Sequence, residues 1–447
     1  MDAKRQAAVE ILQRLREVGF QAYFVGGCVR DMVMGFDPKD YDISTDATPE
    51  QVTRLFPESL TVGAQFGVVM VPRAEGNVEV ATFRSDGRYT DGRHPDDVRY
   101  SKTPQQDVLR RDFTINGLLY DPVKEQVLDY VGGQADIRAR RVRAIGDPSE
   151  RFSEDRLRML RAVRFAVRLK FSLEATAVEA LRKQAPEIRL VSAERVRDEI
   201  LKILTEGRPR QGSELLDTTG LLQEVLPEIK RMQGVAQPPE FHPEGDVWVH
   251  TMMMLEGMRS PTPTLALGVL LHDVGKPPTF SIRERIRFDN HAEVGAKMAE
   301  EILSRLRLSA HDTERVVALV RNHLRFMDFP RMRRSTQLRF LRLPGFDEHL
   351  ELHRLDCLAS HGDLSTYEMA KRLLEETPPE EIRPAPLLRG DDLIAQGYKP
   401  GPLFKEILQA VEDAQLEGKI HTSPQALNLV VERFPLQPSD QCAKVNK

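Results

Sequence analysis

Two aspartates separated by one residue follow a glycine pair near the start of the sequence. Asp40 and Asp42 flank Tyr41, and the period of two along a strand would place both carboxylates on one face. Two adjacent carboxylates repel each other unless a cation bridges them, and Mg²⁺ is the usual cation for such oxygen ligands. Upstream, Gly26-Gly27 ends a β-like run and opens a helix, so backbone N–H groups there could face a phosphate. The pattern predicts a metal-assisted phosphate site.

Charged residues elsewhere could complete such a site. Glu79 lies in an otherwise apolar β-like run and is a candidate third carboxylate, although it could equally face solvent at a sheet edge. Arg30 adds positive charge after the glycine turn, and Arg111 could neutralise a triphosphate. Paired acids on a metal, with arginines for the leaving group, favour in-line phosphoryl or nucleotidyl transfer.

The elements that must position these residues form a mixed α/β head. Short β-like runs at residues 22–25, 68–71 and 78–83 alternate with turns rich in glycine and aspartate. From about residue 150 the apolar period becomes helical and the strand signals stop. The fold class predicted is therefore α+β, with a mixed-sheet head followed by all-α domains.

Length and composition agree with several folded domains. At roughly 100–200 residues per domain, 447 residues predict about three domains. A hydrophobic content of 40% and a charged content of 30% exclude a disordered, collagen-like or disulfide-stapled chain. The formal net charge of −4 by itself argues against a nucleic-acid partner.

Arginine is concentrated between residues 138 and 168. This segment holds ten arginines, four acidic residues and no lysine, so its charge is 10 − 4 = +6, which leaves −10 on the rest of the chain. A helix with charges of both signs usually exposes them to solvent and pairs them within the helix. Here the ten arginines outnumber the four acidic residues of the segment. Because a planar guanidinium suits phosphates and base edges, we expect a polyanionic partner.

Four motifs together resemble the class II tRNA nucleotidyltransferase and bacterial poly(A) polymerase family. The likeness covers the head and continues into the arginine-rich segment. The motifs are Gly26-Gly27-x-x-Arg30-Asp31, Asp40-x-Asp42-Ile43, Arg110-Arg111-Asp112-Phe113-Thr114-Ile115-Asn116 and Glu154-Asp155-Arg156-Leu157-Arg158. The resemblance implies a nucleotidyltransferase-type head, with catalytic Mg²⁺ on Asp40 and Asp42, assistance from Glu79, and triphosphate contacts from Gly27, Arg30 and Arg111.

The resemblance also implies how a base is chosen. Asp155 and Arg158 would form a protein template, since a carboxylate accepts from an exocyclic amine and a guanidinium donates to ring acceptors, a combination that cytosine and adenine both offer. Arg161 and Arg164 would reach phosphates, and the four side chains are expected to fan across a broad helix face. The simpler alternatives are surface solubility for the arginines and a helix-terminal charge for Asp155.

The activity implied is addition of the 3′-terminal CCA to tRNA from CTP and ATP, with release of pyrophosphate. Three alternatives stay open: an A-only-adding enzyme, a poly(A) polymerase, and an HD phosphohydrolase whose head serves only to bind RNA. Residues 62–67 lack the basic element typical of poly(A) polymerases, and residues 84–95 resemble the full-length flexible loop of CCA-adding members. Gly117 departs from the alanine usual in the family, at an expected helix-propensity cost of up to about 1 kcal/mol.

Histidine marks a second candidate site. Nine of the eleven histidines lie between residues 242 and 361. His272-Asp273 resembles the HD phosphohydrolase signature, with His250 upstream and Asp356 as the distal acid, and these four residues could bind a second divalent transition metal. His291 and His323 could complete a second metal site or cap helices. The resemblance implies phosphatase or cyclic phosphodiesterase activity on RNA ends.

These features predict four domains. They are a catalytic head (1–145), a helical neck for nucleotide templating and RNA binding (146–240), an HD domain (241–365) and a helical tail (366–447), with a helix at about 403–417. Three cysteines far apart in sequence and the absence of a long apolar run predict a reduced, cytoplasmic protein with no membrane contact. The partners expected are the tRNA 3′ end, CTP and ATP, and no protein partner is inferred.

Overall fold

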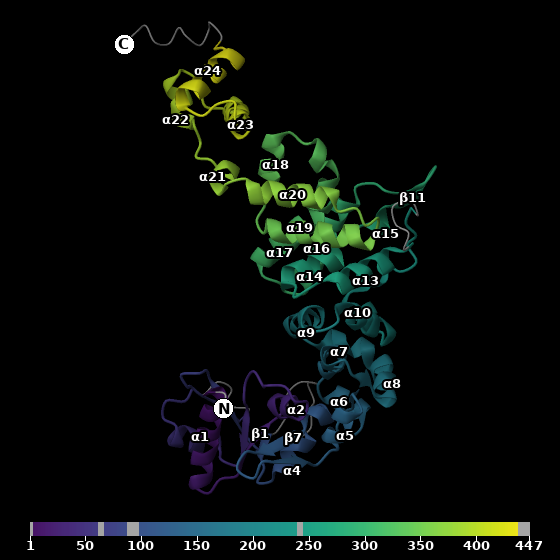
Figure 1. Ribbon diagram of the computed structural model, residues 1–447. Helices are drawn as coiled ribbons and strands as arrows, with labels where there is room; N and C mark the ends of the chain where they lie inside the picture. The colour runs from purple at the N-terminus through teal and green to yellow at the C-terminus, as the bar shows by residue number, and fades with distance from the viewer. Residues whose placement is uncertain (1–2, 61–66, 87–97, 239–244, 437–447) are drawn as a thin grey trace. The chain divides into compact units, whose positions relative to one another are not determined.

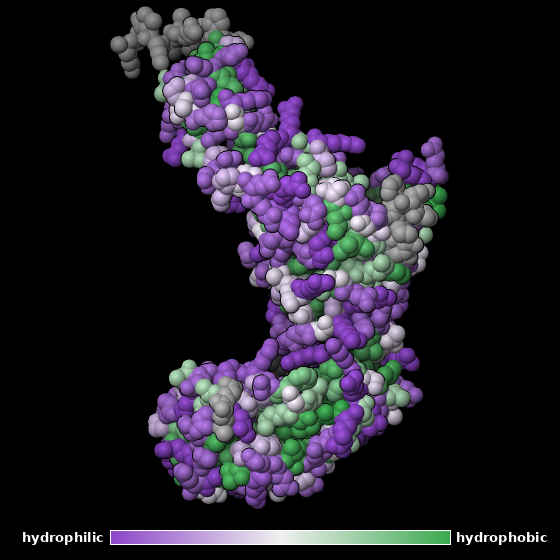
Figure 2. Space-filling view, in the orientation of Figure 1, coloured by the Kyte–Doolittle hydropathy of each residue, from purple (hydrophilic) through white to green (hydrophobic). Residues whose placement is uncertain are grey.

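The computed structural model describes residues 3–60, 67–86, 98–238 and 245–436 of the chain. Packing divides the chain into two compact units. Unit 1 comprises Met1–Gln233, Met258–Leu267 and Ile302–Leu308, and unit 2 comprises Gly234–Gly257, Gly268–Glu301 and Ser309–Lys447. Figure 1 labels some of their helices and strands, and Figure 2 shows that hydrophilic side chains cover most of the viewed surface. Within the described ranges, no helix is long and apolar enough to cross a membrane.

Unit 1 contains a six-stranded mixed sheet. Its strands are β1 (Ala22–Val25), β2 (Ile43–Thr45), β3 (Val68–Val71), β4 (Val78–Thr82), β7 (Leu118–Asp121) and β8 (Gln126–Asp129). The strand order is β3-β4-β2-β1-β7-β8, in which β2 and β4 are parallel and the other neighbours are antiparallel. The predicted mixed-sheet head is confirmed, and the runs at 22–25, 68–71 and 78–83 correspond to β1, β3 and β4.

Asp40 and Asp42 lie just before β2 and not within it. The regular strand begins at Ile43, although the Asp42 carbonyl still accepts from the Val25 backbone N–H at 3.0 Å. In register, Phe24 faces Ile43 across β1 and β2. Both of these side chains are fully buried, so they anchor the strand ends next to the aspartates.

Short helices cover the sheet and continue into the rest of unit 1. Helix α1 (Ala3–Glu17) packs against β1 and β2, and α2 (Gly27–Val33) packs against β1 and β7, beside which it is drawn in Figure 1. The other helices up to residue 230 are α3 (Pro49–Leu55), α4 (Pro104–Leu109), α5 (Gly133–Arg138), α6 (Pro148–Glu154), α7 (Arg158–Leu169), α8 (Ala175–Gln184), α9 (Ala193–Thr205), α10 (Pro209–Thr218), α11 (Leu221–Val225) and α12 (Pro227–Lys230), with 3₁₀ helices η2 (Thr114–Asn116) and η3 (Ala185–Leu190).

Helix α7 is the centre of the helical part of unit 1. Its neighbours are α6, α9 and α10. Apolar side chains on several of its sides are buried, which an arginine-rich surface helix would not require. They are Met159, Leu160, Ala162, Val163, Phe165, Ala166 and Val167.

Two pairs of short strands accompany the helices of unit 1. Strand β5 (Arg84–Asp86) is antiparallel to β6 (Val98–Tyr100). Strand β9 (Arg141–Val142), near the start of the arginine-rich segment, is parallel to β10 (Ser172–Leu173), which follows the end of that segment.

The described residues after 246 are mainly helical. A single antiparallel pair among them, β11 (Phe280–Ile282) and β12 (Ile286–Phe288), departs from the predicted all-α composition. The helices are α13 (Val247–Gly257), α14 (Pro263–Leu271), α15 (Lys276–Thr279), α16 (His291–Arg305), α17 (Ala310–Asn322), η4 (His323–Arg331), α18 (Arg334–Leu341), α19 (Phe346–Ala359), α20 (Ser365–Glu376), α21 (Pro379–Ile382), α22 (Gly390–Ala395), α23 (Pro402–Leu416) and α24 (Ser423–Arg433).

The end of the chain has its own small core. Ile407 and Val411 of α23 pack with Leu393 of α22 and Val430 of α24. Thr422 caps α24 in a capping box with Gln425, which satisfies backbone N–H groups at the helix start. The helix predicted at about 403–417 is confirmed as α23.

Gly117 has a packing role that its neighbours in sequence do not reveal. It is the C-terminal cap of η2 and does not lie inside a helix. The prediction that this glycine costs helix propensity is therefore wrong. A Cβ at this position would lie 2.9 Å from Val131 Cγ2, 3.0 Å from Ile145 Cδ1 and 3.2 Å from Val108 Cγ1. Larger neighbours therefore fill the space that an alanine methyl would need.

We expect Gly117→Ala to destabilise the fold by about 1–3 kcal/mol, because overpacking forces its neighbours to shift. Urea unfolding measures this change. Val131→Ala in the same background should restore part of the loss, with Val131→Ala alone as the control. An alanine variant as stable as the wild type, or more stable, would contradict the packing explanation.

Candidate active site

Side chains of the sheet region and of the arginine-rich segment line one cavity in unit 1. Its volume is about 550 Å³. The glycine turn, the paired aspartates, the Arg-Arg-Asp motif and the predicted template residues all reach it. The predicted site residues that line it are Gly27, Arg30, Asp40, Asp42, Arg111, Asp155, Arg158, Arg161 and Arg164.

The turn between β1 and α2 positions Arg30. Gly26 adopts φ 75° and ψ −129°, a conformation that favours glycine, and so turns the chain into the helix. The Arg30 side chain is buried and donates through Nη1 to Asn116 Oδ1 at 2.7 Å. Its Nε and Nη2 donate to Asp31 Oδ1 at 2.9 and 2.7 Å. The guanidinium is therefore held in one orientation at the cavity wall.

The two aspartates differ in environment. Burial, together with the nearby Glu79 carboxylate, raises the pKa of Asp42 to about 6 although Arg111 acts in the opposite direction. The Asp40 side chain is 77% exposed and accepts from Lys4 Nζ at 3.2 Å. A cation next to Asp42 would offset the cost of ionising this carboxylate, and both residues supply the hard oxygen ligands that Mg²⁺ prefers.

Glu79 is close to Asp42 without being part of a tight cluster. It lies on β4 opposite Met70 and is not among the residues that line the cavity. In the described parts of the chain, some groups of three side chains bring possible metal-ligating atoms within 4.8 Å of one another. Glu79, Asp40 and Asp42 belong to none of these groups. Its effect on the pKa of Asp42 is nevertheless direct, since the two carboxylates repel each other.

A carboxylate that our sequence reasoning missed holds both arginines of the Arg-Arg-Asp motif. Asp107 is fully buried and accepts from Arg110 Nη2 at 2.7 Å and from Arg111 Nη2 at 2.9 Å. Ser44 Oγ on β2 donates to the same carboxylate at 3.2 Å. Burial alone would raise the pKa of Asp107, but Arg111 and Arg110 outweigh it and lower this pKa to about 2. An acid three and four positions before paired arginines is the signal that could have identified it.

The aspartate of the same motif joins the sheet region to α7. Asp112 Oδ2 accepts from Arg161 Nη2 at 2.6 Å and from Nε at 2.9 Å. Burial alone would raise the pKa of Asp112, but the Arg161 guanidinium lowers it below its usual value. Arg161 thus lines the cavity while its Nε and Nη2 atoms are bound to Asp112.

The surplus of arginines in residues 138–168 is balanced by acids from elsewhere in the fold. The premise that these guanidiniums lack partners is wrong, because eight of the ten form ion pairs and most of the acids lie outside the segment. The pairs are Arg141 and Arg143 with Asp136, Arg151 and Arg158 with Glu154, Arg156 with Glu187, Arg161 with Asp112, Arg164 with Glu199, and Arg168 with Glu206.

The predicted template residues lie on different kinds of backbone. Arg158 begins α7 with Arg161 and Arg164, as expected, and donates to Glu154 Oε2 at 2.6 Å and to the Arg110 carbonyl at 3.1 Å. Asp155 lies between α6 and α7 in an extended conformation (φ −139°, ψ 104°). The expected helical fan is therefore wrong for Asp155 alone, because α6 ends at Glu154 and a turn precedes α7.

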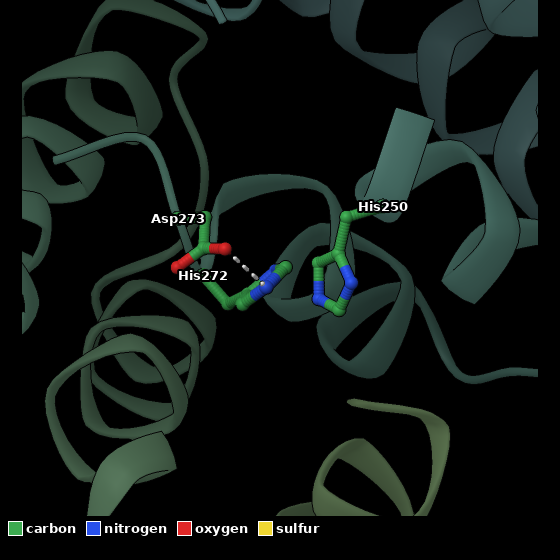
Figure 3. A group of neighbouring side chains, drawn as sticks. All are labelled: His250, His272 and Asp273. Carbon is green, nitrogen blue, oxygen red and sulfur yellow. Dashed lines mark ion pairs between the residues drawn. The ribbon is translucent and has the colours of Figure 1, made fainter. Parts of the chain in front are cut away.

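Unit 2 contains a second cluster, made of four histidines and two aspartates. His250 Nε2 on α13 lies 3.1 Å from Asp356 Oδ1 on α19. His272 Nε2 lies 3.1 Å from Asp273 Oδ2, and Figure 3 shows the His250 ring beside this pair. All four predicted HD residues are thus brought together. Two sets of ligand atoms lie within 4.8 Å of one another, namely His250-His272-Asp273 and Asp273-His291-His323.

Hydrogen bonds determine which ring nitrogens face this cluster. The Nδ1 atoms of His272, His291 and His323 each lie 2.7–2.9 Å from the backbone carbonyl three residues upstream. A carbonyl can only accept, so each Nδ1 is the donor, and the Nε2 of a neutral ring carries a lone pair. The Nε2 atoms of His291 and His323 are 3.3 Å apart. Two lone pairs at this distance repel each other unless a cation lies near both.

Electrostatics keep the cluster in the state that binds metals. Burial lowers the pKa of His323 to about 3 and also lowers the pKa of His291, so both rings are neutral at pH 7. Burial would raise the pKa of Asp273, but His272 and Lys276 hold it well below its usual value. Lys276, which the sequence reasoning did not single out, lies 2.7 Å from Asp273 Oδ2. The donor set of imidazoles and carboxylates suits a divalent transition metal.

Family comparisons match the chain in three consecutive regions. Residues 22–143 match the poly A polymerase head domain, residues 170–233 match the family described as "Probable RNA and SrmB- binding site of polymerase A", and residues 247–352 match the HD domain. Two curated relatives are the CCA-adding enzymes of Levilactobacillus brevis, 43% identical over 220 residues, and Bacillus pumilus, 41% identical over 224 residues. The chain thus contains regions that match a poly A polymerase head domain, the RNA-binding region of that family and an HD domain. The resemblance drawn from the motifs is confirmed.

The sequence match to these two relatives is partial, whereas the match to one solved structure of another relative is nearly complete. The aligned residues are 49% and 50% of this chain and span 55% and 56% of the two relatives' own length. The crystal structure of the Bacillus stearothermophilus CCA-adding enzyme in complex with CTP has a TM-score of 0.74 and 27% identity, and the match covers 97% of this chain and 99% of that one.

Two sequence features used to separate family members lie mainly outside the described residues. The stretch 62–67, without the basic element of poly(A) polymerases, is described only at Gly67. The loop-like segment 84–95 is described only at its start, where Arg84 to Asp86 form β5.

We expect Asp42→Asn to stabilise the metal-free protein increasingly as the pH rises. The pKa of Asp42 in the fold is about 6, above its ordinary value of 3.8, so the folded state binds this proton more tightly than the unfolded state. The protonated Asp42 therefore contributes stability to the wild type below pH 3.8, and this contribution is lost as the pH rises through the folded-state pKa of about 6. Urea unfolding in EDTA should show almost no difference from the wild type below about pH 4 and a constant gain above about pH 7.

Asp40→Asn is the matched control for this prediction. Its carboxylate is exposed and paired with Lys4, so the substitution should give no such pH-dependent gain. A difference between Asp42→Asn and the wild type that stays constant from pH 4 to pH 8 would contradict the raised pKa.

Proposed function

We propose that the protein is a tRNA nucleotidyltransferase that adds the 3′-terminal CCA to tRNA from CTP and ATP and releases pyrophosphate. The observation that carries this proposal is the single cavity lined by the paired acids, the anchored arginines and the template pair. In this assignment, residues 1–145 carry catalysis, 146–240 select the nucleotide and bind RNA, 241–365 form the HD domain and 366–447 form the tail.

The proposed reaction is an in-line attack of the tRNA 3′-hydroxyl on the α-phosphate of the nucleotide. Mg²⁺ held by Asp40 and Asp42 would supply charge neutralisation for the phosphates. Arg111, oriented by Asp107, and Arg30, oriented by Asn116, offer guanidinium donors to the triphosphate. Because both side chains are held before the nucleotide arrives, little reorganisation accompanies transfer of charge to pyrophosphate.

Base choice would rest on Asp155 and Arg158. The Asp155 carboxylate accepts from the exocyclic amine of cytosine or adenine, and Arg158 donates to ring acceptors. Uracil and guanine present a carbonyl oxygen where the amine would be, and a carboxylate repels it. The Arg158 guanidinium is also bound to the Arg110 carbonyl, which links base choice to the triphosphate-binding motif.

Several observations favour CCA addition over its rivals. The curated relatives are named CCA-adding enzymes, and the structural relative with a TM-score of 0.74 was crystallised with CTP, a substrate that neither a poly(A) polymerase nor an A-only enzyme would need. The template pair also suits both bases and not adenine alone.

The deciding experiment offers tRNA lacking its 3′ end together with CTP, ATP or both, and sequences the products. We expect three added nucleotides ending in CCA. Asp42→Ala should lower the rate by more than about a hundredfold without loss of folding, since it removes a charge at the reacting phosphate. Asp198→Ala, which removes an exposed carboxylate paired with Arg197, is the control and should keep the wild-type rate. Long A tracts, or no incorporation, would overturn the proposal.

A second activity is proposed for unit 2, namely metal-dependent phosphohydrolysis by the HD domain. The observation in its favour is the buried cluster of Asp273 with converging histidine lone pairs. His250, His272, Asp273 and Asp356 would hold a divalent transition metal, and a metal bound there would activate water for attack on a phosphoester. The triad of Asp273, His291 and His323 offers ligands for a second ion.

Metal analysis and hydrolysis of bis-para-nitrophenyl phosphate test this second activity. We expect His272→Ala to lose bound metal and to hydrolyse the ester at least about tenfold more slowly, as loss of a ligand predicts. His311→Ala, which removes an exposed histidine outside the cluster, should behave as the wild type. Equal metal content and equal hydrolysis in His272→Ala and the wild type would refute the activity.

A further inference from the structure

Asp155 needs an external anchor to present its carboxylate to a base. It lies on extended backbone between α6 and α7, where its N–H donates to the Arg151 carbonyl at 3.4 Å and its carbonyl accepts from the Arg158 N–H at 2.9 Å. These contacts involve the Asp155 backbone and not its carboxylate. Its Oδ1 accepts from the Leu157 backbone N–H at 3.1 Å. The other contact comes from a distant helix: Arg195 Nη2 donates to Oδ2 at 2.9 Å and to Oδ1 at 3.2 Å. Arg158 differs in this respect, because its guanidinium is bound by Glu154 and by the Arg151 and Arg110 carbonyls.

Arg195 is itself held firmly against the cavity. It belongs to α9, which packs along α7, and two further ion pairs join these helices. Arg164 Nε lies 2.6 Å from Glu199 Oε2 in a buried pair, and Arg168 Nη1 lies 3.4 Å from Glu206 Oε2 nearer the surface. The Arg195 side chain is 25% exposed and lines the same cavity as Asp155. The guanidinium therefore approaches Asp155 from a fixed support.

We infer that Arg195 determines nucleotide selectivity by positioning Asp155, an inference that rests on the proposed function. Both carboxylate oxygens of Asp155 accept from Arg195 Nη2, and Oδ1 also accepts from the Leu157 N–H. These contacts hold the carboxylate in one orientation, in which Oδ2 can accept a further hydrogen bond. A carboxylate held in this way accepts from the amine of cytosine or adenine and repels the carbonyl of uracil. Without Arg195 the carboxylate can rotate away from the base, and this change removes the discrimination against uracil.

The experiment measures kcat and KM for CTP, ATP and UTP on tRNA lacking its 3′ end. In Arg195→Gln we expect the ratio of kcat/KM for CTP over UTP to fall by about tenfold or more, mostly through a higher KM for CTP. Arg195→Lys, which retains the charge but not the planar fork, should keep part of this ratio. Glu206→Gln removes another α7–α9 ion pair away from Asp155 and should keep the wild-type ratio.

A double-mutant cycle separates positioning from general support of the helix. If Arg195 acts through Asp155, the variant with both Arg195→Gln and Asp155→Asn will have the same CTP-to-UTP ratio as Asp155→Asn alone. Additive losses would overturn the inference, and so would a wild-type ratio in Arg195→Gln, whatever the total activity. A wild-type protein that adds neither C nor A fails the proposed function instead, and the inference fails with it.

Discussion

Guanidinium groups repel one another, so many of them can line one cavity only where fixed carboxylates lie behind them. Unit 1 meets this constraint with buried acids on separate elements. Asp107 binds two arginines, Asp112 binds Arg161, and Glu199 binds Arg164. Removing one partner of a buried pair typically costs about 3–5 kcal/mol, so these acids are as necessary to the cavity as the arginines.

The same ion pairs hold distant parts of the cavity at a constant spacing. Asp112 joins the sheet region to α7 through Arg161, and the Arg110 carbonyl receives a hydrogen bond from Arg158. The end of the cavity that would bind phosphates is therefore connected to the end that would recognise the base by short, charge-assisted contacts. Such preorganisation is what transfer chemistry with little covalent participation by the protein requires.

Unit 2 handles buried polarity in a different way. In unit 1 the donors and acceptors of the cavity wall are largely matched within the protein. In the histidine cluster, acceptors face acceptors, since the Nδ1 atoms are committed to backbone carbonyls and the Nε2 lone pairs converge on Asp273. The two clusters also differ in ligand type, because carboxylate oxygens favour Mg²⁺ and imidazoles favour transition metals.

The sequence by itself determined the features that depend on neighbouring residues: strands β1, β3 and β4, helix α23, the aspartate pair, the Arg-Arg-Asp motif and the HD pair. Tertiary structure decided the partners of the arginines, the anchors Asp107 and Arg195, the position of Asp155 off the helix, and the crowding around Gly117. Arg161 and Arg195 meet their acids across 49 and 40 positions. Periodicity and motif spacing describe short stretches of backbone, whereas which charges meet across such distances depends on which elements pack together, and net charge carries no information about that packing.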